Sequence, residues 1–211
     1  MPGRPRTVRP RKAGAAAGPG AAGPGGDVGE PAEPADPESV ARLICLRQLT
    51  AAPRTRAQLA DTLRRRGVPD EAAAAVLARF AEVGLIDDAM FANAWVESRH
   101  YSRGLGRRAL AAELNQRGVD RSDIQAAVAQ VSPERELATA RALVERRLAS
   151  TAGQPAQVRI RRLAGMLARK GYPPGLAYRV VREALEQEGQ DQAAAIDDDV
   201  FEAEFGEGEL G

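Results

Sequence analysis

Three pairs of leucines stand four residues apart along the chain, and each pair is followed by a cation and a glycine. These units are Leu59 and Leu63 before Arg66-Gly67, Leu110 and Leu114 before Arg117-Gly118, and Leu163 and Leu167 before Lys170-Gly171. Residues four apart lie on one face of a helix, so each pair predicts an amphipathic helix. A cation favours the negative end of a helix, and glycine readily adopts the left-handed conformation that follows it. The pattern therefore predicts three helices that each end at a glycine.

These units form an internal repeat, because their glycines are 51 and 53 residues apart. Each unit is followed by a short apolar helix and preceded by a further helical stretch, over residues 38–49, 88–101 and 133–148. A repeat of this length is typical of arrays in which each unit buries part of its apolar face against its neighbours. We therefore predict an all-α fold of nine helices, arranged as three tandem three-helix repeats in a curved, elongated array. The repeats span residues 38–86, 87–131 and 132–188.

Helix-capping residues support this division. Asp36 precedes Pro37 and Glu38, Thr55 stands three residues before Gln58 as in a capping box, and Ser132 precedes Pro133 and Glu134. The pair Asp87 and Asp88 is placed to begin one further helix, and Asp120 another. No stretch alternates between apolar and polar residues as a strand does, and no Asn-Gly or Asp-Gly hairpin signal occurs.

The two ends of the chain differ in composition from the body. Residues 1–37 are mostly Ala, Gly and Pro with few large apolar side chains, and residues 189–211 are rich in acids. Neither segment buries enough apolar surface to offset its conformational entropy, so we predict a disordered leader and a disordered acidic tail. Alternatively, the tail folds back on the body through Phe201 and Phe205 and competes with an acidic partner or DNA.

Charge is segregated along the chain, although the net charge is only +1. Residues 38–188 hold 25 cations and 17 acids, whereas residues 189–211 hold eight acids and no cation. A basic body joined to an acidic tail favours a polyanion or an acidic protein surface as partner.

Residues that perform chemistry are scarce. The single cysteine, Cys45, excludes an internal disulfide, and with the single histidine, His100, it excludes most zinc sites. We expect Cys45 to be a buried small apolar residue and His100 to lie at the surface or in a corner. No apolar run is long enough to span a membrane, and no signal peptide is evident. These features predict a cytoplasmic protein without metal or cofactor.

The middle of the chain carries the most distinctive motif. It comprises Gly84-Leu85-Ile86-Asp87-Asp88, Phe91-Ala92, Trp95-Val96, Ser98-Arg99, Gly104, Gly106, Leu110, Glu113-Leu114 and Arg117-Gly118-Val119. This motif closely resembles that of the RecX family, and the likeness extends over residues 38–188. Members of that family are built from tandem three-helix repeats, which agrees with the repeat deduced from the leucine and glycine spacing.

The resemblance implies a modulator, usually an inhibitor, of the RecA recombinase. Such proteins bind within the helical groove of the RecA–DNA filament and touch adjacent subunits. They suppress strand exchange, ATP hydrolysis and the co-protease activity that starts the SOS response. They have no catalytic activity of their own, so we expect no catalytic residues. We also expect the chain to act as a monomer. The leader and the acidic tail depart from the family's pattern, and the resemblance assigns neither a role.

Cations of the second and third repeats form the candidate surface for binding a partner. They are Arg99, Arg103, Arg107, Arg108, Arg117, Arg159, Arg161, Arg162, Arg169 and Lys170. Arginine holds carboxylates or phosphates through paired hydrogen bonds. We therefore expect this surface to contact a RecA filament and the phosphates of single- or double-stranded DNA. An ordinary solvated face is the alternative for any one of these residues.

Two further features of the second repeat have structural interpretations. Phe91 and Trp95 lie four residues apart, which favours packing between repeats over a platform that stacks the bases of single-stranded DNA. Gly104 and Gly106 favour a corner between helices over a phosphate cradle, because no strand precedes them.

Two other functional classes fit parts of the sequence. The main alternative is a helix-turn-helix transcription regulator, because residues 55–66 and 69–83 predict two helices joined by a short turn. Those helices offer mostly Ala and Arg, with few of the Asn, Gln or Ser side chains that contact base edges. An enzyme that acts on nucleic acid is disfavoured, because the adjacent acids of the body stand at helix starts and predict no two-metal site.

Overall fold

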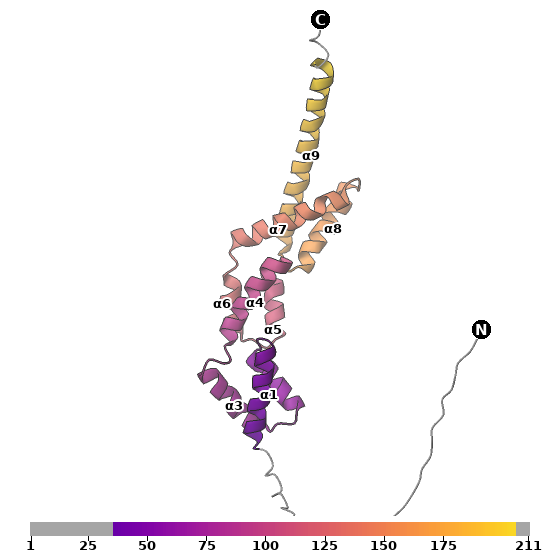
Figure 1. Ribbon diagram of the computed structural model, residues 1–211. Coiled ribbons are helices and arrows are strands. Elements are labelled where there is room, and N and C mark those ends of the chain that lie inside the picture. The colour runs from indigo at the N-terminus through magenta and orange to yellow at the C-terminus, as the bar shows by residue number, and fades with distance from the viewer. Residues whose placement is uncertain (1–35, 206–211) are drawn as a thin grey trace, which may run out of the picture. The chain divides into compact units, whose positions relative to one another are not determined.

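The computed structural model describes residues 36–205, with side chains for residues 36–189 (Figure 1). This part of the chain contains nine α-helices, one short 3-10 helix and no strand. The helices are α1 (Pro37–Ala51), α2 (Arg56–Arg65), α3 (Asp70–Glu82), α4 (Asp88–Arg103), α5 (Arg107–Asn115), α6 (Arg121–Ala129), α7 (Pro133–Leu148), η1 (Ala149–Thr151), α8 (Ala156–Arg169) and α9 (Pro174–Phe205). Among the described helices, none has the length and apolar character needed to cross a membrane.

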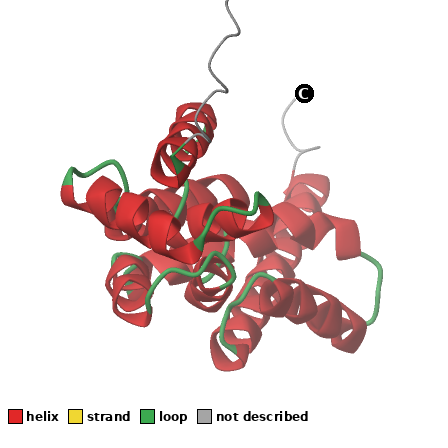
Figure 2. Cartoon of the chain, turned by 90° about the horizontal axis from the view of Figure 1, so that it is seen from below, coloured by secondary structure: helices red, strands yellow, loops and turns green. Residues whose placement is uncertain are grey.

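The helices form three modules of three, each around its own apolar core. Module 1 consists of α1–α3, module 2 of α4–α6 and module 3 of α7–α9, with short loops between most of the helices (Figure 2). The six leucines of the repeat pairs are at most 2% exposed. Burying each of them contributes roughly 1.5–3 kcal/mol. The predicted all-α fold of three tandem three-helix units is confirmed.

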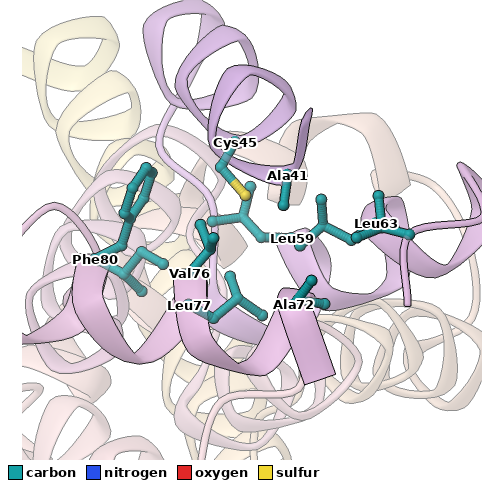
Figure 3. Packing of buried hydrophobic residues seen from close by; sticks show 11 residues of the cluster. Ala41, Cys45, Leu59, Leu63, Ala72, Val76, Leu77 and Phe80 are labelled. Carbon is teal, nitrogen blue, oxygen red and sulfur yellow. The ribbon is translucent and has the colours of Figure 1, made fainter. Parts of the chain in front are cut away.

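The core of module 1 contains the only cysteine of the chain. Figure 3 shows Ala41 and Cys45 of α1 beside Leu59 of α2 and Val76 of α3. Cys45 is fully buried, and this burial raises the pKa of its thiol above the usual value. The prediction that Cys45 serves as a small buried apolar residue is therefore confirmed.

Most of the predicted helix caps are present. Thr55 and Gln58 form a reciprocal capping box at the start of α2. Three further side chains accept hydrogen bonds from the first turns of α1, α4 and α7, namely those of Asp36, Asp87 and Ser132. Asp120 occupies the position before α6, but its side chain makes no capping hydrogen bond.

Helix α9 extends beyond the predicted end of the folded body. The sequence predicts disorder over residues 189–211, whereas α9 is helical as far as Phe205. Residues 190–205 contain no glycine or proline and include three consecutive alanines, so helix propensity favours continuation of the helix. Residues 206–211 lie outside the described part of the chain. So does the predicted disordered leader, residues 1–37, apart from its last two residues, where the cap and first residue of α1 lie.

The modules are joined through two junctions of the same design. At the first junction, the start of α2 meets the end of α5, where the Thr55 hydroxyl donates to the Arg117 carbonyl at 2.6 Å. The backbone N–H of Arg56 donates to Asp88 of α4 at 2.9 Å. An acid from the first helix of module 2 thus caps the second helix of module 1.

The second junction repeats this arrangement between modules 2 and 3. The Gly106 N–H donates to the Lys170 carbonyl at 2.8 Å, and the Arg107 N–H donates to Glu136 of α7 at 2.9 Å. Gly106 and Lys170 hold the repeat positions that Thr55 and Arg117 hold at the first junction. The internal repeat therefore includes the contacts between the modules as well as the helices within them.

Two of the repeat glycines are also required by these junctions. Gly67, Gly118 and Gly171 have φ angles of 73°, 72° and 86°. A Cβ atom on Gly118 would lie 2.3 Å from Ala57 Cβ, and one on Gly171 would lie 2.3 Å from the Ala109 nitrogen. A Cβ atom on Gly67 would meet nothing within 4 Å. Gly118 and Gly171 thus allow neighbouring modules to approach, whereas Gly67 serves its own turn alone.

Candidate basic binding surface

Trp95 of α4 is enclosed by arginines of its own module. The guanidinium carbons of Arg99 and Arg117 lie 4.2 Å and 3.6 Å from the indole centroid, within cation–π distance. The ring of Phe91 stacks on Trp95 at 5.7 Å, and the indole N–H donates to Glu113 Oε2 at 2.9 Å. Phe91 and Trp95 therefore pack as expected, but against the core of module 2 rather than between repeats.

Glu113 of α5 binds three of the predicted surface arginines. Its carboxylate lies 3.8 Å from Arg99 Nε and 3.3 Å from Arg103 Nη1, and its backbone carbonyl accepts a hydrogen bond from Arg117 Nη1 at 2.8 Å. Burial lowers the pKa of Arg117, Arg99 adds to this effect, and Glu113 opposes it. These contacts form a clasp between α4 and α5, which leaves its arginines less free to bind a partner.

Arg107 and Arg108 begin α5 at the corner that contains Gly104 and Gly106. Within the described part of the chain, neither arginine side chain makes an ion pair, and Arg108 is exposed. The N–H groups of both glycines donate to backbone carbonyls, that of Gly104 to His100 and that of Gly106 to Lys170. The glycines therefore form the predicted corner between helices, and their amides are not available to a phosphate.

His100 was predicted to lie at the surface or in a corner; it is buried, and it lies beside the corner between α4 and α5. It is 3% exposed, with Nδ1 2.9 Å from the Leu105 carbonyl and Nε2 3.0 Å from Thr139 Oγ1 of α7. It follows Ala92 and Val96 at intervals of four residues, and both of these are buried. That spacing places His100 on the buried face of α4, where it connects the α4–α5 corner to module 3.

The predicted arginines of module 3 divide into a partly buried brace and an exposed group. Arg159 is 13% exposed, pairs with Glu188 at 2.6 Å and donates to Thr151 Oγ1 at 3.0 Å. It therefore braces α8 against α9 and is unavailable to a partner. Arg161, Arg162 and Arg169 are exposed on α8.

Lys170 brings the two predicted cation clusters together at the second junction. Its ammonium donates to the backbone carbonyl of Arg103, the last residue of α4. Burial lowers the pKa of Lys170, and the nearby charges of Arg103, Arg146 and Arg147 lower it further. Arg146 and Arg147, in the last turn of α7, were not among the predicted surface residues.

A cleft of about 580 Å³ lies between the end of α7 and α8. It is lined by Leu143, Arg146, Arg147, Ser150, Thr151, Arg162, Leu163, Met166, Arg169 and Lys170. The lining thus contains five cations and no acid. Sequence reasoning identified the three cations that follow residue 160. It missed Arg146 and Arg147, because a cationic last turn is common in any helix.

Comparison with protein families identifies all three modules. The models of the first, second and third three-helix domains of RecX match residues 41–80, 87–128 and 134–181. Together these matches cover most of the described residues.

Individual relatives agree with the family match. The chain is 68% identical over 149 residues to regulatory protein RecX of Thermobifida fusca, covering 71% of this chain and 80% of that protein. It is 62% identical over 151 residues to regulatory protein RecX of Streptomyces lividans, covering 72% and 80%. It is 47% identical over 156 residues to that of Mycolicibacterium smegmatis, covering 72% and 82%.

Solved structures share the fold. The crystal structure of RecX from Lactobacillus salivarius superimposes with a TM-score of 0.66 at 18% identity, covering 71% of this chain and 97% of that one. A crystal structure of another regulatory protein RecX gives a TM-score of 0.64 at 25% identity, covering 71% and 73%. From the domain matches and the identity to these relatives, we conclude that this chain belongs to the RecX family of regulatory proteins.

Proposed function

We propose that this protein regulates a RecA recombinase by binding its filament on DNA and inhibiting strand exchange, ATP hydrolysis and co-protease activity. The observation that carries this proposal is family membership across all three modules, with 68% identity to a regulatory protein RecX. The second and third modules also present cations that no described carboxylate neutralises.

The protein acts through binding energy alone. Hydrogen bonds at both junctions hold neighbouring modules together, so the cations they carry are positioned before the partner arrives. A pre-organised surface loses less conformational entropy on binding than a flexible one. Bound across adjacent filament subunits, such a surface holds them out of the register that ATP hydrolysis and strand exchange require.

The contact residues are the cations without ion pairs rather than those of the clasp. Arg107, Arg108, Arg161, Arg162 and Arg169 are free of ion pairs within the described chain, and they steer the protein toward a negatively charged filament. The predicted residues Arg99, Arg117 and Arg159 instead support the surface from within, through their contacts with Trp95, Glu113 and Glu188.

The test is ATP hydrolysis by a RecA protein on single-stranded DNA, measured with increasing amounts of this protein. The double substitution Arg107→Gln and Arg108→Gln is compared with Arg64→Gln and Arg65→Gln, an adjacent pair in the equivalent helix of module 1. The latter two arginines pair with Asp61, at 3.4 Å and 2.8 Å. We expect inhibition by the native chain, a weaker effect of the first variant, and little change with the second.

Two outcomes would overturn the proposal. One is unchanged hydrolysis and strand exchange at saturating amounts of the folded protein. The other is tight, sequence-specific binding to bare duplex DNA without any effect on a recombinase, which would identify the helix-turn-helix transcription regulator instead.

A further inference from the structure

The cleft between α7 and α8 concentrates positive charge more strongly than the rest of module 3. Arg146 and Arg147 approach it from the last turn of α7, and Arg162, Arg169 and Lys170 approach it from α8 and its cap. The floor is apolar and consists of Leu143, Leu163 and Met166. The cleft is open to solvent, so a ligand longer than the cleft can enter and leave it.

The cations of the cleft make no ion pair with a described carboxylate, and three acids of α9 pair with arginines outside the cleft. Glu183 pairs with Arg141 at 2.9 Å and with Arg179 at 3.9 Å, and Glu186 pairs with Arg182 at 3.4 Å. These ion pairs lie on α9 and the face of α7 that packs against it. The fold thus separates a neutralised face from a cationic one.

The cationic cleft holds like charges close together in the free protein. The lowered pKa of Lys170 reflects burial together with repulsion from Arg146 and Arg147 of α7 and from Arg103 of α4. An anion bound among these groups would relieve that repulsion. The two hydroxyls of the lining, Ser150 and Thr151, already donate to backbone carbonyls, so recognition in the cleft falls to the cations.

The chemistry of the ligand follows from the uniform sign of the charge. Five cations without an acid match a chain that carries a negative charge at every unit, as a nucleic-acid strand does. The surface of a folded protein partner mixes both signs. Arginine also holds phosphate oxygens through paired hydrogen bonds, which suits the four arginines of the cleft.

The size of the cleft favours one strand over two. Its volume of about 580 Å³ lies in the range of small-molecule sites, which is too small for both strands of a duplex. A duplex would touch only the rim. We infer that the cleft between α7 and α8 binds successive phosphates of a single nucleic-acid strand, with Arg146, Arg147, Arg162, Arg169 and Lys170 as its contacts. This inference does not depend on the proposed action on a recombinase.

The experiment measures binding of a fluorescein-labelled oligodeoxythymidylate to the full chain by anisotropy, without any recombinase, over a series of KCl concentrations. The variant Arg162→Gln with Arg169→Gln removes two cleft cations. The control, Arg179→Gln with Arg182→Gln, makes the same change of net charge on α9, where both arginines are paired with glutamates. Circular dichroism confirms that both variants fold.

We expect the native chain to bind the oligonucleotide with an affinity that falls steeply as salt increases. The cleft variant should bind roughly tenfold more weakly at low salt, a difference of about 1.4 kcal/mol. Its plot of log affinity against log salt should be shallower by about 1.4, or ~0.7 for each phosphate that the variant leaves without a cation. The α9 control should stay within about twofold of the native chain.

Two results would overturn the inference. They are no binding of the oligonucleotide by the native chain at low salt, and equal losses of affinity in the cleft and control variants. Displacement of the oligonucleotide by polyglutamate at the same charge concentration would instead identify the cleft as a site for an acidic peptide.

Discussion

Glu136 of α7 accepts the backbone N–H of Arg107, the first residue of α5, at 2.9 Å. The carboxylate is 5% exposed, so it caps a helix of module 2 from within the interface with module 3. Asp88 and Arg56 form the corresponding contact between modules 1 and 2. Each side chain accepts an N–H that has no partner within its own helix, so each acid both joins two modules and caps a helix.

Replacing Glu136 with alanine should destabilise the fold, because the Arg107 N–H then loses its acceptor in a buried site. The expected loss is about 1–3 kcal/mol in the free energy of unfolding, measured by urea denaturation. Glu136→Gln keeps an acceptor oxygen and should lose distinctly less. Equal losses in the two variants would show that the charge, rather than the hydrogen bond, stabilises the junction.

Alanine substitutions at the repeat glycines should separate two requirements, the left-handed backbone of the turn and the close approach of neighbouring modules. In Gly67→Ala the added Cβ meets no atom within 4 Å. The variant should therefore lose only roughly 1–2 kcal/mol of unfolding free energy, which is the cost of a left-handed alanine. Gly171→Ala meets backbone and side-chain atoms of Ala109 at 2.3–2.9 Å and should lose a further ~1–3 kcal/mol from overpacking. Similar urea midpoints for the two variants would contradict a role of Gly171 at the junction.

The helices and their ends were predictable because local physics determines them. The leucine pairs, the capping box at Thr55 and the glycine at each helix end depend on neighbours within four or five residues. The structure contains all of these features. Disorder after residue 188 was predicted from the scarcity of apolar surface to bury, whereas helix propensity, which acts locally, favours the continuation of α9 as far as Phe205.

The candidate site was less predictable, because it depends on which faces tertiary packing brings together. Arg99 and Arg103 stand in a stretch without acids, yet Glu113 reaches both from the next helix. Arg159 has the sequence context of a surface residue, but Glu188 of α9 pairs with it. For His100 a signal was present in the spacing of four residues from Val96, which is buried on the same face of α4.

Asp88→Asn should test the effect of burying a charge at the first junction. Burial raises the pKa of Asp88, although its hydrogen bond from the Arg56 N–H opposes this shift. A carboxyl whose pKa is raised by folding binds its proton more tightly in the folded state, so its ionisation costs stability as pH rises from its unfolded pKa through the folded one. Asparagine keeps the acceptor without the charge. The variant should therefore equal or exceed the native chain in stability at neutral pH, with the difference shrinking in acid.

Asp36→Asn provides a control of opposite sign for that pH series. Hydrogen bonds from Ser39 lower the pKa of Asp36, so its contribution to stability is present above its unfolded pKa and is lost as pH falls through the folded one. The asparagine variant should be slightly less stable than the native chain at neutral pH and equal to it in acid. Parallel urea midpoints for the two variants from neutral to acidic pH would contradict the assignment at Asp88.

Tyr172→Phe should weaken the second junction and make the fold less sensitive to alkali. The buried Tyr172 hydroxyl donates to the Gly104 carbonyl at 3.1 Å, and its removal should cost about 0.5–1.5 kcal/mol at neutral pH. Burial, together with the charge of Glu136, raises the pKa of Tyr172 far above its usual value. The folded state therefore holds the phenolic proton more tightly than the unfolded one, and stability that is present below about pH 10 is lost as pH rises above it.

Urea midpoints should fall more steeply above about pH 10 for the native chain than for Tyr172→Phe. Tyr101→Phe, at an 88% exposed position, should follow the native curve. Parallel curves for the native chain and Tyr172→Phe would show that Tyr172 is not the group that makes the fold sensitive to alkali.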